Sequence, residues 1–342
     1  MQPTQQLKRV LSGMRPTGKL HLGNYMGALA NWVKLQHEYD CYFFIADWHA
    51  LTTDYADSSK LGANISEVAL DFLGAGLDPE KCVLFTQSLV KQHNELFTAF
   101  AMITPLGWLE RVPTYKEQQE NLSGKDLSTY GFLGYPLLMA SDILVYQPDF
   151  IPVGQDQLAH VELTREIARR FNQFYKRSDG SEIFPEPKAL ITASPKLSGT
   201  DGRKMSKSYG NTIQLNDSEA EIRKKLKGMV TDPARIRRTD AGDPNKCPVG
   251  DLHKAFSTAE TLAKVYDGCR TAGIGCIECK GWAADALVQV ILPIQERRAS
   301  YTEAQAEEIF RAGSERADVR AEQTMTEVRA AIGLPAHRER AK

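Results

Sequence analysis

The chain has 342 residues, 42% hydrophobic and 25% charged, with 42 Lys and Arg against 43 Asp and Glu. This length predicts two domains, and the composition is that of an ordinary soluble globular protein. A net charge of −1 argues against a nonspecific polyanion binder, so nucleic-acid contacts must rest on local basic patches. Without an apolar run long enough to cross a bilayer or a secretory signal, we expect a cytoplasmic protein that contacts neither membrane nor DNA.

The N-terminal half alternates strand-like and helix-like segments. Near-continuous apolar runs predict parallel strands covered on both faces, starting at Val10 and spanning 41–46, 82–85 and 150–153. Helices are predicted between them, over 22–37, 58–76, 136–146 and 157–174. This alternation predicts an α/β fold, with a Rossmann-like doubly wound parallel sheet in a catalytic domain over 1-212.

Beyond this domain the pattern becomes purely helical. We expect a C-terminal all-helical domain over 213-300, with helices at 219–229, 252–266 and 282–299, the last bent by Pro293. Thr302 and Gln305 form a capping box for a final helix within 301-342, whose apolar stripe predicts that it packs back onto the protein.

Two segments carry the main chemical signal. Lys204-Met205-Ser206-Lys207-Ser208 suits a mobile loop that closes on a polyphosphate, because lysines follow shifting charge while hydroxyls add directional donors. A solvated basic turn is the usual interpretation of such a pentamer alone. The other segment, PTGKLHLGN over 16–24, turns from strand to helix, where backbone N–H groups and the helix dipole suit a phosphate.

Together and in this order, the two segments resemble the signature motifs of class I aminoacyl-tRNA synthetases. YPLLMASDI from Tyr135, VGQDQ from Val153 and PIQER from Pro293 also resemble stretches of the bacterial tryptophanyl-tRNA synthetase family. The resemblance runs from about Val10 to Leu334. It implies a tryptophan–tRNA ligase that activates L-tryptophan with ATP and transfers it to tRNA(Trp), and it favours a homodimer. The apolar segment 97–108 is our candidate for the dimer contact.

The resemblance implies specific nucleotide contacts. His21, Lys116, Lys204 and Lys207 become the catalytic groups, with the three lysines holding pyrophosphate. Mg²⁺ is expected to arrive with ATP, since the sequence offers no dedicated carboxylate cage. Asn24 replaces the final histidine of the general class I motif, and Arg15 stands where many bacterial members have glutamine. The implied ATP contacts are Arg15, Pro16, Thr17, His21, Gly23, Asn24, Gly154, Gln155, Asp156, Lys204, Met205, Ser206, Lys207 and Ser208.

Asp142 is the candidate reader of the amino acid. Alone, an aspartate in an apolar helix is most simply a carboxylate that reaches water or a lysine. The resemblance instead makes it the acceptor for the indole N–H, with Met139 on the ring and Tyr135 and Gln157 at the ammonium and carboxylate end. His49 is expected to flank the pocket, a buried structural histidine being the alternative.

Four of the six cysteines, Cys247, Cys269, Cys276 and Cys279, fall in one window with the spacing C-x21-C-x6-C-x2-C. In a reducing compartment, this clustering indicates a metal centre more than disulfides. Structural zinc sites usually use two close pairs, whereas this window has one. Some tryptophanyl-tRNA synthetases carry a four-iron–four-sulfur (4Fe-4S) cluster on similar spacing, and the chain resembles that subgroup. Zinc (Zn) and unligated cysteines remain the alternatives.

Three competing functions remain. A tyrosine-specific synthetase is disfavoured by Leu11, which cannot bond a phenol hydroxyl where that family places a tyrosine. A small-molecule nucleotidyltransferase would leave the helical C-terminal part and its basic clusters, 223–227 and 235–238, unexplained. A tryptophan-sensing paralogue without catalysis is disfavoured by the intact His21, Lys204 and Lys207.

Overall fold

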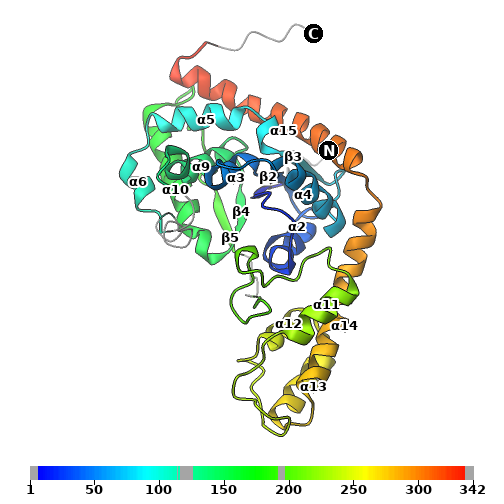
Figure 1. The fold of residues 1–342 in the computed structure, drawn as a ribbon. Helices are drawn as coiled ribbons and strands as arrows, with labels where there is room; N and C mark the ends of the chain where they lie inside the picture. Colours follow the sequence, from blue (N-terminus) through cyan, green and yellow to red (C-terminus); the bar gives the residue numbers. More distant parts are fainter. Residues whose placement is uncertain (1–6, 114, 116–125, 192–196, 336–342) are drawn as a thin grey trace, which may run out of the picture.

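The computed structural model describes residues 7–113, 115, 126–191 and 197–335. Its centre is a five-stranded, all-parallel sheet in the order β3-β2-β1-β4-β5 (Figure 1). The strands are β1 (Arg9–Met14), β2 (Asp40–Ile45), β3 (Cys82–Thr86), β4 (Phe150–Val153) and β5 (Lys188–Ile191). The predicted Rossmann-like, doubly wound sheet is therefore confirmed, although β5 was not predicted.

Side-chain alternation along the strands supplies the two faces of the sheet. Val10 and Phe43 point into one apolar cluster, whereas their neighbours Leu11 and Phe44 point into another. The first cluster holds α2 (Ala30–Leu35) and α4 (Leu61–Ala75), and the second holds α5 (Gln92–Ala101), α9 (Tyr135–Leu144) and α10 (Leu158–Phe174). Both faces are thus buried, as near-continuous apolar strands require.

Shorter elements complete the part of the structure around the sheet, and several of them were not predicted. They are α3 (Asp47–Asp54), α6 (Leu106–Glu110) and α8 (Tyr130–Leu133), with 3-10 turns at Gln87–Leu89, Gln155–Gln157 and Lys207–Tyr209. The helix predicted over 22–37 consists of α1 (Leu22–Asn24), a π-helical turn (Tyr25–Leu29) and α2. Among the described residues, no helix combines the length and the apolarity needed to cross a membrane.

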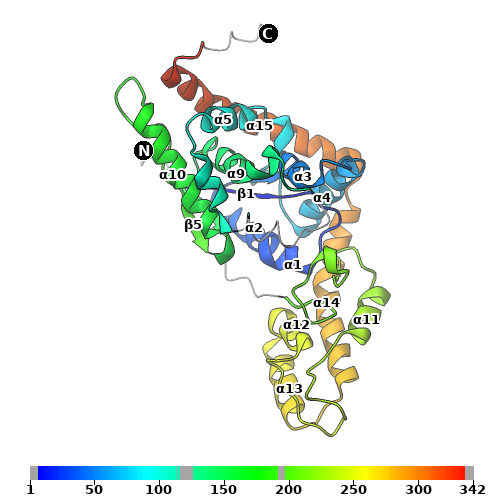
Figure 2. The same cartoon turned by 60° about the vertical axis from the view of Figure 1, so that its left-hand side comes forward.

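Four helices project together from the catalytic part: α11 (Glu219–Gly228), α12 (Pro248–Phe256), α13 (Ala259–Arg270) and α14 (Cys276–Ala299) (Figures 1 and 2). The prediction of one helix over 252–266 was wrong. The Thr258 side chain accepts the N–H of Thr261 and starts α13, so the chain leaves the helix at Ser257.

Helix α14 joins the projecting helices to the catalytic part. Near its C-terminal end, the Arg298 Nε donates to Asp71 Oδ1 at 3.0 Å, and the other Asp71 oxygen accepts the Leu20 N–H at 3.1 Å. The Arg297 Nε donates to the Gly74 carbonyl at 2.9 Å. Asp71 therefore connects α14 directly to the turn that precedes α1.

Helix α15 (Glu303–Ile332) runs back along the catalytic part and covers the edge strand β3 (Figure 1). The predicted Thr302–Gln305 capping box is present, and Gly333, with φ 77°, ends the helix. Gly313 lies so close to β3 that a Cβ there would collide with the Leu84 carbonyl. The Ser314 hydroxyl accepts the Thr86 N–H at 3.2 Å, so the helix satisfies a donor on the sheet edge.

Candidate active site

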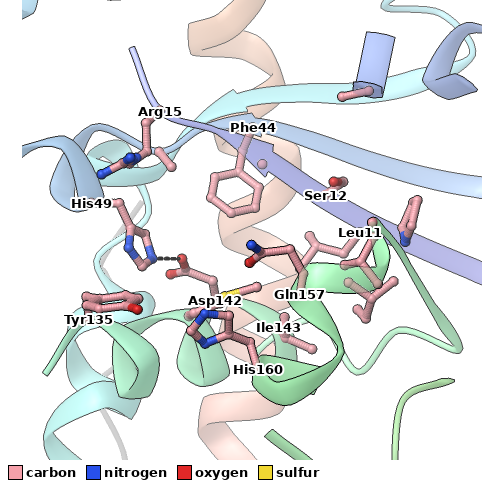
Figure 3. Close-up of a pocket in the computed structure, with 18 of the residues that line it drawn as sticks. Leu11, Ser12, Arg15, Phe44, His49, Tyr135, Asp142, Ile143, Gln157 and His160 are labelled. Carbon is pink, nitrogen blue, oxygen red and sulfur yellow. Dashed lines mark hydrogen bonds and ion pairs between the residues drawn. The ribbon is translucent and has the colours of Figure 1, made fainter. Parts of the chain in front are cut away.

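A cavity of about 380 Å³ opens at the carboxyl ends of β1, β2 and β4. Strand order reverses between β1 and β4, and open α/β sheets bind ligands in the crevice at such a point. Figure 3 shows side chains from β1, β2, α3, α9 and the β4–α10 turn converging on this space. The lining includes Leu11, Arg15, Phe44, His49, Tyr135, Met139, Asp142, Ile143, Val153, Gly154, Gln157 and His160.

The Asp142 carboxylate lies at one wall of the cavity and is only 2% exposed. Its Oδ1 accepts hydrogen bonds from Gln87 Nε2 at 2.7 Å and His93 Nδ1 at 2.6 Å. Its Oδ2 is 2.9 Å from Gln87 Nε2 and 2.8 Å from His49 Nε2 (Figure 3). Burial raises the pKa of the carboxyl, but His49 and His93 outweigh burial and hold the pKa below its usual value. The cavity therefore contains an ionised acceptor.

The rest of the cavity wall combines apolar and polar side chains. Leu11, Phe44 and Ile143 supply apolar surface, and Met139 of α9 is half-buried beside them. The His160 ring lies 5.6 Å from the Tyr135 ring, and burial lowers its pKa to about 4, so His160 is neutral. The site combines one buried anion with apolar surface from several elements.

His21 caps the helix that follows the glycine-rich turn. Its Nδ1 accepts the Gly23 N–H at 3.1 Å, and burial together with the Lys207 charge lowers its pKa to about 4. A neutral ring that accepts at Nδ1 carries its proton on Nε2, which leaves Nε2–H as a donor for a phosphate oxygen. Gly23 permits this arrangement, since a Cβ there would lie 2.8 Å from the His21 Cε1. Asn24 completes the cap by accepting the His21 N–H at 3.1 Å.

The Lys204–Ser208 loop reaches the glycine-rich turn through Lys207. The Lys207 Nζ donates to the Gly18 carbonyl at 2.7 Å and lies 3.4 Å from Thr17 Oγ1. Lys204 is exposed, whereas the Met205 side chain is buried in the core, so Met205 offers a nucleotide only its backbone. Ser206 and Ser208 hydroxyls lie 2.8 Å apart, pointing to the same side of the loop.

Of the other sequence-predicted nucleotide residues, Arg15 and Gly154 line the cavity, whereas the remaining ones are their neighbours in the chain. Pro16 and Thr17 belong to the glycine-rich turn beside exposed Arg15, and Gly154, Gln155 and Asp156 follow the carboxyl end of β4. A Cβ on Gly154 would lie 2.7 Å from Asp156 Oδ1, so a larger residue there would shift the Asp156 side chain. Lys116 lies outside the described residues.

The four clustered cysteines line a second, smaller cavity where α12, α13 and α14 meet, together with Asp232, Arg235 and Val249. Burial and the neighbouring thiols raise the pKa of Cys279 to about 12. Within the part of the chain that is described, no group of three or more His, Cys, Asp or Glu side chains has the arrangement of a metal site as it stands. Cys41 and Cys82 lie buried in the sheet as free thiols.

Comparison with known proteins identifies the family. The profile described as tRNA synthetases class I (W and Y) matches residues 4–291. The chain belongs to this class I synthetase family. Its relatives include a tryptophan–tRNA ligase of Thermotoga maritima, 52% identical over 95% of this chain and 99% of that protein. Another, from Ralstonia nicotianae, is 46% identical over 96% and 98%, respectively.

A solved structure of a family member has the same fold. The tryptophanyl-tRNA synthetase of Campylobacter jejuni, complexed with ADP and tryptophan, superposes with a TM-score of 0.84 at 34% identity. The match covers 95% of this chain and all of that one. The match therefore includes both the sheet and the projecting helices of this class I synthetase.

Sequence reasoning missed several groups that shape the synthetase site. Gln87 and His93 bind Asp142 from α5 and the turn before it, and His160 and Phe44 line the cavity. They come from separate segments, so no local motif links them. One signal was available: Gln87 directly follows the carboxyl end of β3, at the sheet edge where such folds bind ligands.

Proposed function

We infer that the protein is a tryptophan–tRNA ligase. The observation that carries this inference is the buried, ionised Asp142 in an apolar slot beside the glycine-rich turn. An indole has one hydrogen-bond donor and no acceptor, so a fixed acceptor in an apolar pocket selects it. Leu11 lines the same slot and offers no partner for a phenol hydroxyl, which favours tryptophan over tyrosine.

The proposed reaction needs alignment and charge neutralisation. The carboxylate of tryptophan is ionised at neutral pH and attacks the α-phosphorus of ATP without a general base, while pyrophosphate departs. In this proposal His21 Nε2–H and Lys207 bind phosphate oxygens, and Mg²⁺ carried by ATP would neutralise further charge. The aminoacyl group then passes to the terminal ribose of tRNA(Trp).

The test is amino-acid-dependent exchange of pyrophosphate into ATP, with tryptophan and tyrosine in parallel, followed by charging of tRNA. Exchange with tryptophan alone supports the proposal, and exchange with tyrosine alone favours the tyrosine-specific alternative. If the purified protein exchanged neither, the inference would be wrong, and a binding paralogue would be the better explanation.

We propose that the projecting helices, with residues 213–300, bind the anticodon region of tRNA. Arg237 and Arg238 are exposed beside Ile236, which is 88% exposed, so this loop presents cations with an apolar side chain. Arg235 instead turns inward toward Cys269 and the Ile274 carbonyl. Arg223 pairs with Glu219 and Asp285, so its cluster is better explained as a solvated helix face.

We propose that the group held by the four thiols of the cysteine-lined cavity is a 4Fe-4S cluster, with zinc as the alternative. All four cysteines face one space, and the Arg235 Nη1 lies 3.7 Å from Cys269 Sγ, where a cation would stabilise thiolates. The Arg235 Nε is buried without a hydrogen-bond partner, an unsatisfied donor directed into the same region. Bound by Cys247, Cys269, Cys276 and Cys279, the cluster would cross-link α12, α13 and α14 as a structural centre.

Anaerobically purified protein is expected to be brown, with broad visible absorption and bound iron, because thiolate-to-iron charge transfer absorbs in this region. Cys269→Ser should lose the colour and the iron, whereas Cys41→Ala, at a buried thiol outside the cavity, should keep both. Colourless wild-type protein with stoichiometric zinc by elemental analysis would decide for the zinc alternative.

A homodimer is expected in solution, and the segment 97–108 is its proposed contact. Met102 and Leu106 are 77% and 60% exposed there, an apolar surface that a second subunit would cover. Light scattering at micromolar concentration should give a dimer mass, which Met102→Glu should reduce. Val319→Glu, at a 60% exposed apolar residue of α15, serves as the control. A monomer mass for the wild type would refute the prediction.

A further inference from the structure

The Asp142 carboxylate has a cavity side and a buried side. His49 lines the cavity, whereas Gln87 and His93 bond the carboxylate from positions outside the cavity lining, and both are 0% exposed. Three side chains thus use both carboxylate oxygens as acceptors. Only the His49 bond lies where a ligand could compete with it.

The His93 ring is fixed in orientation and tautomer. Because the ionised carboxylate only accepts, the His93 Nδ1 carries a proton and donates it to Asp142. On the other side, the His93 Nε2 lies 2.8 Å from the Tyr146 hydroxyl. The ring packs against the rings of Phe44, Phe85 and Tyr146 at centroid distances of 6.0, 6.0 and 5.4 Å. It therefore cannot turn without breaking buried contacts.

The Gln87 amide is fixed as well. Its Oε1 accepts the Trp48 N–H at 3.1 Å, which orients its NH₂ group toward both oxygens of Asp142. Trp48 lies in the first turn of α3, the helix that carries His49. The orientation of the carboxylate is consequently set by Gln87 and His93 as well as by helix α9.

We propose that Gln87 and His93 are positioning residues that give the site its selectivity for the indole N–H. This inference rests on the proposed function. By holding the carboxylate from behind, they keep it ionised and aim one oxygen, Oδ2, into the cavity. Tyr146 acts indirectly, because its hydroxyl contacts His93 and holds that ring in place. A buried polar cluster with a merely structural role would stabilise the fold without distinguishing between substrates.

A positioning role and a merely structural role can be distinguished with a substrate that lacks the indole N–H group. The experiment compares kcat/KM in adenylate formation for tryptophan and for 3-(benzothiophen-3-yl)alanine, in which sulfur replaces the indole N–H. The ratio of the two values does not depend on how much of a variant is folded. We expect the wild type to prefer tryptophan by about 10- to 100-fold, as one buried hydrogen bond to an ionised partner predicts.

His93→Leu and Gln87→Leu should each reduce this preference by about tenfold, mainly through the KM for tryptophan. His93→Asn, which keeps a donor near the Nδ1 position, should retain most of the preference. Cys82→Ala removes a buried thiol at the opposite end of β3 from Gln87 and should leave the preference unchanged.

Tyr146→Phe removes one hydroxyl only and should lower the preference about twofold to threefold. This mild variant provides the measurement if the leucine variants fail to fold. Losses that are equal for the two substrates would overturn the proposal and leave the cluster a structural role. A wild type without tryptophan-dependent activity would instead contradict the proposed function itself.

Discussion

Replacing Asp142 by alanine is expected to raise the KM for tryptophan about 5- to 150-fold, which corresponds to about 1–3 kcal/mol for a buried donor left without its partner. The indole N–H would then lie in an apolar slot where water cannot replace the carboxylate. Because the indole is far from the reacting phosphorus, kcat should change less than KM. The effect is thus one on substrate binding.

Steady-state pyrophosphate exchange at varied tryptophan measures this change. Thermal unfolding must be followed in parallel, since the substitution also leaves His93 and Gln87 without their acceptor. Ser141→Ala is a matched control, because its buried hydroxyl bonds only the Leu137 carbonyl within α9. Unchanged affinity of Asp142→Ala for tryptophan would remove Asp142 from the binding site.

Replacing Lys207 by alanine is expected to slow tryptophanyl-adenylate formation on the order of a hundredfold while leaving tryptophan binding nearly intact. Its ammonium group lies at the glycine-rich turn, 2.7 Å from the Gly18 carbonyl, where pyrophosphate charge would develop. Negative charge grows on pyrophosphate as it departs, so the Lys207 ammonium group should stabilise the transition state more than the bound substrates. Lys204→Ala should act in the same direction from the exposed end of the loop.

Single-turnover adenylate formation and equilibrium tryptophan binding separate these effects, with Lys81→Ala as a distant control. Burial lowers the pKa of Lys207 to about 8, so the free protein loses this cation as pH rises through about 8. The kcat/KM for ATP should therefore fall above that pH, and Lys207→Arg should move the fall to higher pH. Variants that change only the tryptophan KM would give the loop a different role.

The fold could be predicted from the sequence where strands are buried on both faces of the sheet or where capping residues mark the start of a helix. Apolar runs such as 41–46 gave the parallel strands, and the Thr302–Gln305 box gave the start of α15. The strand β5 was missed because its residues are half-buried or exposed and carry little apolar signal. The break at Ser257 was missed because the apolar period continues on both sides of it.

The candidate site was predictable where a motif is contiguous and unpredictable where contacts join distant segments. His21, Lys207 and Asp142 lie within recognisable stretches, and the structure brings them to one end of the sheet. The partners of Asp142 come from sequence separations of 49, 55 and 93 residues. Only the packing of α5 and α3 against α9 makes them neighbours.

Helix α14 connects two chemically different ends of the structure. Its 24 residues give a length of about 36 Å, with two cysteines at one end and the Arg298–Asp71 pair at the other. A tilt of about 5° around the arginine end displaces the cysteine end by about 3 Å, by leverage alone. Since Asp71 also holds the Leu20 N–H, such a tilt must break the ion pair or pull on the glycine-rich turn. A displacement of the cysteine end would thus be transmitted to the backbone of the glycine-rich turn.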